Sequence, residues 1–255
     1  MNPQTFPTVQ SGERTNSSGK AISNQILLAL PEEEFALVRP YLETLDLPSR
    51  FSLHEPDRPL EFLCFPNHGL ISVVVSTKDG RTVEAGLIGR EGCAGTPLAV
   101  NLKTSPLLQV VQLAGDSCRL PRTALEVVLP LTPKFRFALS RFAVIQSMQT
   151  AQTAACNRLH EVEQRLARWL LMAQDRVDSA WLAITHDFLA TMLGTDRPTV
   201  TVAARKLQDR KAIEYKPGAV RVVNHHTLEQ SACECYEVIQ RFNGELGIRQ
   251  QAPSL

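Results

Sequence analysis

The spacing of hydrophobic residues changes twice along the 255-residue chain, which predicts helices, then short strands, then helices again. From Ser23 apolar residues recur every three or four positions, and Pro31 is placed to begin a second helix. Between about Leu47 and Pro121, short apolar runs alternate with turn sequences rich in glycine, asparagine and aspartate. After Pro121 the helical spacing returns. The pattern therefore predicts an α+β protein.

The middle segment has the pattern of an antiparallel β barrel. Leu70–Val75, Val83–Ile88 and Gln109–Leu113 are apolar runs of strand length. Asp79-Gly80, between two such runs, predicts a hairpin with a type I′ turn, which requires positive φ. Several strands at this spacing predict an N-terminal jelly-roll barrel with flanking helices.

Residues 134–174 contain neither proline nor glycine, which predicts a long helix followed by another, with a bend near Cys156–Arg158. Two interpretations of the long helix remain open. It is either an ordinary core helix or a dimerisation helix whose apolar stripe packs on a symmetry mate. The apolar positions are Phe135, Leu139, Phe142, Ile145 and Met148.

The most informative pattern is a pair of short helices. Thr185 can cap a first helix that Gly194 ends, and Asp196 can cap a second helix that carries Pro198 in its first turn. Small residues on one face of the second helix allow the two helices to approach closely. That face consists of Val200, Ala203, Ala204 and Leu207.

A predicted hairpin around Lys216-Pro217-Gly218 follows these helices, so the segment is predicted to be a winged helix-turn-helix. The predicted domains are a flexible tail at 1–20, a jelly-roll sensor at 21–132, a dimerisation helix at 133–157, a winged helix-turn-helix at 158–226, and a C-terminal helix and tail at 227–255.

The outer face of the second helix is predicted to contact double-stranded DNA. Arginine is the commonest bidentate reader of guanine, threonine hydroxyls suit phosphates, and Val202 offers only an apolar contact, for example to a thymine methyl. Residues 176–226 also carry 8 basic and 5 acidic side chains, the one segment with a positive excess. The predicted DNA-binding residues are Arg197, Thr199, Thr201, Val202, Arg205, Lys206, Lys216 and Arg221.

Over about residues 23–242 the chain resembles Crp/Fnr-family transcription regulators, most specifically at Glu84–Pro97 and Gly194–Leu207. The resemblance implies a sensor like cyclic-nucleotide-binding domains, a homodimer, and DNA and RNA polymerase as partners. It places the family's leading base-reading arginine on Arg197. A glutamate beside it is replaced by Pro198 and a second arginine by Val202, so the operator of the best-known members is not expected.

The sensor lacks the residues that the family uses for its known effectors. Where cyclic-nucleotide binders have a Gly-Glu-Leu turn, Gly92–Pro97 has no acid after its glycines, and Asn101–Gln112 holds Lys103 but no Arg-Ser or Arg-Thr pair. Binding of cAMP is therefore not expected, and the effector stays unknown. Iron–sulfur sensing in the family needs a cysteine cluster near the N-terminus, whereas the first cysteine here is Cys64.

We predict no cofactor and no metal site. Cys93 and Cys118 are expected to be small core residues. Cys233-x-Cys235, with His225-His226 upstream, lacks the ligand spacing of zinc fingers, so buried thiols on a helix are expected there.

The sequence also bears on the class of protein. It contains no Gly-x-Ser-x-Gly, P-loop or dinucleotide fingerprint, so we expect a non-enzyme. No run of about 18 apolar residues and no apolar run before Ile22 occurs, so a cytoplasmic protein without a membrane span is expected. The alternative is a jelly-roll small-molecule-binding or interaction protein whose winged helix contacts protein rather than DNA.

Overall fold

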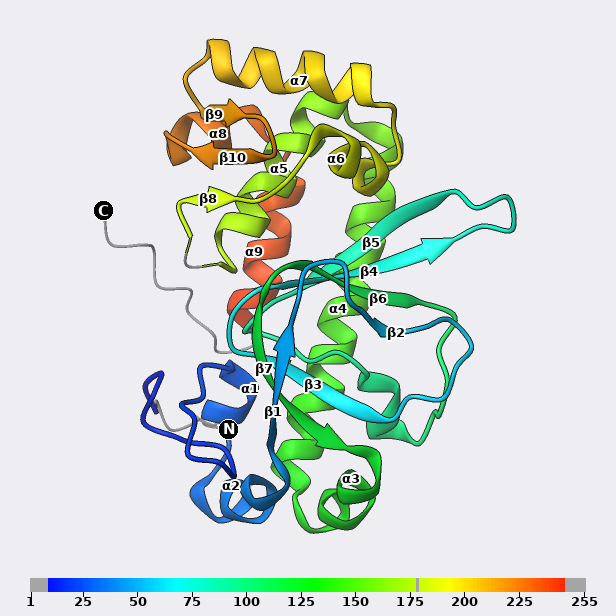
Figure 1. Ribbon diagram of the computed structural model, residues 1–255, viewed down its shortest axis with the longest axis vertical. Helices are drawn as coiled ribbons and strands as arrows, with labels where there is room; N and C mark the ends of the chain where they lie inside the picture. Colours follow the sequence, from blue (N-terminus) through cyan, green and yellow to red (C-terminus); the bar gives the residue numbers. More distant parts are fainter. Residues whose placement is uncertain (1–8, 178, 246–255) are drawn as a thin grey trace. The chain divides into compact units, whose positions relative to one another are not determined.

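The computed structural model describes residues 9–177 and 179–245, which pack as two compact units (Figure 1). Of these residues, the first unit holds 9–71 and 88–145, and the second holds 72–87 and 146–245. The division passes through two strands and one long helix, so each unit contains a part of all three. Helices and antiparallel sheets occur in the predicted order, which confirms the α+β class.

The chain before the first strand is tied to the first unit. It forms α1 (Gln25–Leu28), α2 (Glu32–Val38) and the 3-10 turn η1 (Arg39–Tyr41), and Pro31 directly precedes α2. The Arg14 guanidinium donates to the carbonyls of Leu27 and Leu28 at 2.8 and 3.2 Å and is 6% exposed.

The flexible tail predicted for residues 1–20 is therefore wrong over 9–20, and residues 1–8 lie outside the described part. A buried guanidinium with carbonyl partners anchors a segment whose polar composition alone indicated mobility. Arg14 also pairs with Glu32 at 3.1 Å and lies 4.3 Å from the centroid of the Phe35 ring.

The strands that follow are antiparallel and form two sheets. One sheet has the order β1-β7-β3, from β1 (Glu43–Leu47), β7 (Gly115–Pro121) and β3 (Phe62–Pro66). The other has the order β2-β6-β4-β5, from β2 (Ser52–His54), β6 (Leu108–Leu113), β4 (Leu70–Ser76) and β5 (Thr82–Ile88). The first unit also contains η2 (Thr96–Val100), α3 (Arg122–Val128) and η3 (Leu129–Leu131).

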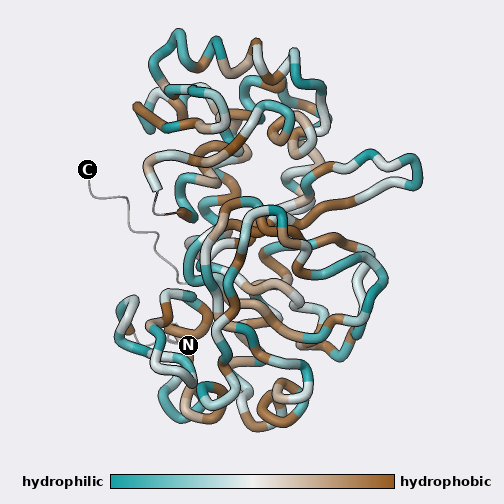
Figure 2. The backbone as a smooth tube through the Cα atoms, viewed as in Figure 1, coloured by the Kyte–Doolittle hydropathy of each residue, from teal (hydrophilic) through white to brown (hydrophobic). Residues whose placement is uncertain are grey.

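The β4–β5 hairpin differs from the prediction at its turn. Gly80 has φ +83°, but Asp79 is not among the described residues with positive φ, so the turn is not type I′. The amide of Thr77 donates to the Arg81 carbonyl at 2.9 Å, which leaves Lys78-Asp79-Gly80 as a three-residue loop. Such a loop needs positive φ only at its last position, where glycine stands. Figure 2 shows the tip as hydrophilic, between more hydrophobic strands.

Helix α4 (Pro133–Leu159) begins where both oxygens of the buried Glu34 carboxylate accept from the amides of Lys134 and Phe135, at 3.0 and 2.8 Å. A carboxylate there pairs with the unsatisfied N–H groups and the positive end of the helix dipole. A Cβ at position 92 would collide with the Phe142 ring of α4, so the glycine at this position lets the backbone lie against that ring. The bend after α4 falls at His160, slightly later than predicted.

Four of the five apolar residues predicted for a dimer stripe lie in the protein's own core. The four are Phe135, Leu139, Phe142 and Ile145, each at most 7% exposed, whereas Met148 is 45% exposed. For these four positions the core-helix interpretation is therefore the right one. The large apolar residues that α4 exposes are Phe137, Val144, Met148 and Leu159.

The second unit contains the predicted pair of helices and the hairpin. Its three-stranded sheet has the order β8-β10-β9. The elements are α5 (Val162–Gln174), β8 (Trp181–Leu182), α6 (His186–Leu193), α7 (Arg197–Asp209), β9 (Ile213–Lys216), β10 (Ala219–Val222), α8 (His225–Ser231) and α9 (Cys235–Glu245).

A buried carboxyl joins β5 to α5 inside the second unit. Glu84 is 5% exposed and accepts from the Ser72 hydroxyl and, at 2.9 Å, from Trp169 Nε1. Burial raises the pKa of Glu84 to about 7, although both hydrogen bonds and the charge of Arg168 act against the rise. The carboxyl is thus protonated in the folded protein over a pH range where it is ionised in the unfolded chain.

Glu84→Gln tests this burial. The pKa of Glu84 in the folded protein exceeds its ordinary value of 4.5, so the folded state binds the proton more tightly than the unfolded chain does. Proton binding therefore adds to the free energy of unfolding at low pH, and this contribution is lost as pH rises from 4.5 through 7. The loss is on the order of 3 kcal/mol for a shift of this size. We expect Glu84→Gln to remove that pH dependence of the unfolding free energy. Both tryptophans, Trp169 and Trp181, belong to the second unit, so their fluorescence follows its unfolding.

Glu55→Gln is the matched control, because Glu55 is exposed and should leave the pH dependence unchanged. A Glu84→Gln variant with the same pH profile as the parent would contradict a buried, protonated carboxyl.

Candidate nucleic-acid interface

The first helix of the pair begins and ends through local capping. The Thr185 hydroxyl accepts from the Phe188 amide at 3.2 Å and caps α6. Gly194 ends the helix with φ 59° and ψ 43°, a left-handed conformation that glycine adopts at low cost. The amide of Thr195 then donates to the Ala190 carbonyl at 2.9 Å. The predicted sharp turn between the two helices is confirmed.

The second helix, α7, begins at the predicted cap. An oxygen of the Asp196 carboxylate accepts from the Thr199 amide at 2.8 Å, and this hydrogen bond lowers the pKa of Asp196. Pro198 lies in the first turn, where its missing N–H costs nothing. The cap fixes the direction in which α7 leaves the turn, and therefore where Arg197 lies.

One face of α7 is sealed against α5 and α6, and the other is open. The predicted core face is confirmed, because Val200, Ala203, Ala204 and Leu207 are each at most 4% exposed. Val202, on the opposite side of the helix, is 58% exposed, and Arg205 is also exposed. Figure 2 shows hydrophilic and hydrophobic stretches alternating along this helix.

Arg197 lies at the open N-terminal end of α7, with 65% of its side chain exposed. Its Nη1 is 3.5 Å from Asp187 Oδ2, and that carboxylate is itself 68% exposed. Ion pairs between exposed side chains contribute little, so Arg197 can exchange this partner for another anion or a base edge.

Thr201 and Lys206, two further predicted contact residues, also have partners within the domain. The Thr201 hydroxyl donates to the Arg197 carbonyl at 2.9 Å. Lys206 Nζ lies 3.3 Å from Glu163 Oε2, and Arg210 Nη1 lies 2.7 Å from Glu163 Oε1. Contact of Thr201 and Lys206 with DNA stays a prediction, as does the role of Thr199, whose backbone amide is used by the cap.

The wing presents both of its predicted cations around one aromatic ring. Lys216 Nζ lies 3.9 Å from the Trp181 ring centroid and Arg221 Cζ lies 5.2 Å from it. Arg221 also forms an ion pair with Glu214. Cation–π attraction therefore orders the two side chains while leaving them at the surface. Trp181 could not be assigned to this site from the sequence, because β8 is only two residues long and reaches the wing by pairing with β10, which lies far along the chain.

His186 is a second residue that the sequence analysis missed. It is 8% exposed, its Nδ1 lies 3.0 Å from the Thr201 hydroxyl, and its ring stacks on Tyr215 with centroids 4.0 Å apart. Burial and the charge of Arg197 lower its pKa, against the opposing charge of Asp187. A neutral imidazole thus links α6, α7 and β9 beneath the open face.

The part of the chain between residues 42 and 132 buries polar groups of a different kind. Burial lowers the pKa of His54 to about 4, and the Gln109 side-chain oxygen accepts from the Gly95 amide at 3.1 Å. Between residues 42 and 132, all of which are described, every arginine is exposed or half-buried. A cavity of about 330 Å³ lies beside η2 and α3, with Leu98, Asn101, Lys103, Arg122, Glu126 and Arg136 among its lining residues.

Comparison with known proteins agrees with this architecture. The family model of a Crp-like helix-turn-helix domain matches residues 164–231, which include α6, α7 and the wing. No curated protein matches the chain by sequence. No helix in the described residues is both long enough and apolar enough to cross a membrane.

Several solved regulators share the fold. The c-di-GMP responsive global regulator CLP of Xanthomonas campestris is 16% identical, with 75% of this chain and 99% of that chain covered and a TM-score of 0.62. FixK2 from Bradyrhizobium japonicum is 14% identical over 75% of this chain and 98% of that chain, with a TM-score of 0.64. A CRP-family transcriptional regulator from Thermus thermophilus, TTHB099, is 19% identical over 74% of this chain and 96% of that chain, with a TM-score of 0.58.

The second unit therefore contains a winged helix-turn-helix. More particularly, residues 164–231 form a Crp-like helix-turn-helix domain, and the chain has the fold of Crp/Fnr-type regulators, which confirms the resemblance stated from the sequence.

Paired valine variants test the assignment of the two faces of α7. We expect Val200→Ala to destabilise the second unit by about 2 kcal/mol, because it deletes fully buried methyl groups. Val202→Ala removes the same atoms from the open face and should leave the unfolding free energy within about 0.5 kcal/mol of the parent. Denaturant unfolding followed by tryptophan fluorescence measures both. Equal losses would contradict an open face at Val202.

Proposed function

We propose that the protein is a sequence-specific DNA-binding transcription regulator of the Crp/Fnr type. The observation that carries this proposal is the open face of α7, which has an exposed arginine at its N-terminal end and a buried opposite face. A helix presented in this way fits the major groove of B-DNA.

The contacts divide by chemistry. Arg197 reads a guanine edge and Val202 meets an apolar group such as a thymine methyl. Arg205 and Thr199 lie on the same open side of α7. Lys206 and Thr201 contact DNA once they are released from their partners in the domain. Lys216 and Arg221, held around Trp181, contact backbone phosphates.

The regulator acts as a homodimer through α4. The exposed apolar positions Phe137 and Val144 are seven residues apart, and Met148 follows four residues later. This spacing is that of a coiled-coil seam, and the fold of its own chain leaves these side chains uncovered. A two-fold dimer reads two half-sites about 34 Å apart through successive major grooves.

The sensor does not bind cAMP. A buried phosphate needs a cation, and residues 42–132 bury the carboxyls of Glu84 and Glu91 but no arginine. The protein carries out no reaction of its own, works in the cytoplasm and contacts RNA polymerase.

An interaction protein whose winged helix contacts another protein is the competing function, and a salt titration on duplex DNA separates the two. For a regulator that neutralises several phosphates, the logarithm of the binding constant falls linearly with the logarithm of the salt concentration, because binding releases counterions. Absence of duplex binding, or binding without that slope, would favour the competing function.

Arg197→Ala tests base reading. We expect a loss of about 1–3 kcal/mol on the preferred duplex, or roughly 5- to 150-fold in Kd, with a much smaller loss on random duplex. Arg58→Ala, at an exposed arginine of the first unit, removes the same charge and should change neither value. Equal weakening on both duplexes would assign Arg197 to phosphate instead. Fluorescence anisotropy at one fixed salt concentration provides the measurement.

Val144→Glu tests the dimer seam. A buried, unpaired carboxylate at a seam position is costly, so this variant should be monomeric at concentrations where the parent is a dimer. Ser147→Glu adds the same charge at an exposed position flanking the seam, where coiled coils commonly carry charges, and should stay dimeric. Light scattering coupled to gel filtration gives the mass. A dimeric Val144→Glu protein, or a monomeric parent, would refute a dimer through this stripe.

A further inference from the structure

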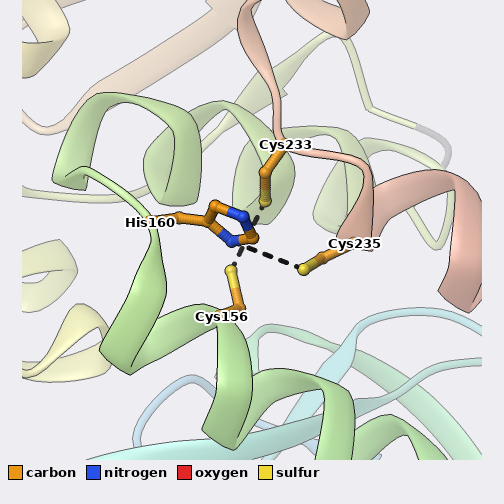
Figure 3. A group of neighbouring side chains, drawn as sticks. All are labelled: Cys156, His160, Cys233 and Cys235. Atoms are coloured by element: carbon orange, nitrogen blue, oxygen red, sulfur yellow. Dashed lines mark hydrogen bonds between the residues drawn. The ribbon is translucent and has the colours of Figure 1, made fainter.

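Three thiols and one imidazole converge in the second unit (Figure 3). Cys156 lies in the last turn of α4 and His160 directly follows that helix, whereas Cys233 precedes α9 by two residues and Cys235 begins it. The four ligand atoms all lie within 4.8 Å of one another. Cys156 Sγ is 3.5 Å from Cys233 Sγ, and Cys235 Sγ is 3.6 Å from His160 Nδ1.

These distances suit a single tetrahedral ion. Zinc lies about 2.3 Å from thiolate sulfur and about 2.0–2.1 Å from imidazole nitrogen, which holds ligand sulfurs roughly 3.8 Å apart. We propose that Cys156, His160, Cys233 and Cys235 bind one Zn²⁺ ion in a closed, structural Cys3His site. An iron–sulfur cluster distributes its cysteines over several irons, so it would hold them further apart.

The surroundings of the ligands support the assignment. Glu234 Oε1 lies 3.3 Å from His160 Nε2, so a proton on Nε2 is bound by the carboxylate and Nδ1 is left as an electron-pair donor facing the thiols. Gln152 Nε2 donates to Cys235 Sγ at 3.0 Å, a contact that favours the thiolate. A histidine oriented by a carboxylate is a usual partner arrangement in zinc sites.

Nearby cations balance the charge. Three thiolates and one Zn²⁺ carry a net charge of −1, and α5 buries Arg165 and Arg168 to 7% and 3% exposure.

Ordinary core packing explains these residues less well. Cys156, Cys233 and Cys235 are at most 4% exposed, but their sulfurs face each other and a polar ring rather than aliphatic side chains. A Cys156–Cys233 disulfide would use two of the four groups and leave the orientation of His160 without a role.

No metal site was expected at the two C-terminal cysteines, because the histidines closest to them in sequence, His225 and His226, lack zinc-finger spacing. His225 lies 3.5 Å from Glu229 and 3.9 Å from Asp175, and His226 lies 3.0 Å from Gln230. The ligands that complete the group come from the last turn of α4 and the residue that follows it, and Cys156 lies 77 residues before Cys233. The ion would cross-link the end of α4 to the turn after α8, within the second unit that carries the winged helix.

The test is metal analysis of the full-length protein, purified with thiol reductant and without chelator or added metal. We expect about one zinc per chain by mass spectrometry of the metal. After removal of zinc by a strong chelator, we expect the melting temperature of the second unit to fall, and Co²⁺ to restore it with the intense sulfur-to-cobalt absorption of a tetrahedral thiolate site.

Cys233→Ser and His160→Ala should lower zinc content and change the Co²⁺ spectrum. Cys118→Ser replaces a buried cysteine of the first unit and should retain both. The metal measurements on the parent protein do not depend on whether any variant folds. They also do not depend on DNA binding, so a negative metal result would leave the proposed regulator function untouched.

Three results would overturn the proposal. They are a natively folded protein that neither contains zinc nor takes up Zn²⁺ or Co²⁺, a Cys156–Cys233 disulfide in protein isolated without oxidant, or iron with acid-labile sulfide in place of zinc.

Discussion

The packing of one face of α7 is the constraint on which the account of this protein depends. Val200 and Leu207 fill the space beneath the helix, and Ala203 and Ala204 keep it close to its neighbours. Because that face is fully used, the side chains about half a turn away must point outward. The exposure of Arg197, Val202 and Arg205 is thus a consequence of core packing, and the proposed readout of DNA follows from it.

Helix α5 organises the polar interactions of the second unit. Through Trp169 it binds the buried Glu84 of β5, and through Glu163 it holds Lys206 and Arg210 of α7. Its buried arginines, Arg165 and Arg168, lie close enough to Cys156 at the end of α4 to interact with it electrostatically. A single amphipathic helix therefore contacts α7 and strand β5 and lies near the proposed metal site.

Features encoded by neighbouring residues could be predicted from the sequence. The caps at Thr185 and Asp196 and the turn at Gly194 act over three or four residues, so their spacing is visible in the chain. Contacts between distant residues could not be predicted. The partners of Lys206 and the group around Cys156 depend on how helices pack, and the anchoring of Arg14 depends on carbonyls at the end of α1. Polar residues with such partners resemble mobile or solvent-facing ones when only composition is considered.

Footprinting of the full-length protein on duplexes selected from a random pool is the decisive test of DNA readout by α7. We expect a preferred sequence with two protected major-groove half-sites about one helical turn apart. We also expect guanine N7 methylation within a half-site to block binding, because the proposed contact of Arg197 uses that edge. Selection that yields no preferred sequence, or protection that is indifferent to N7 methylation, would contradict readout by the open face of α7.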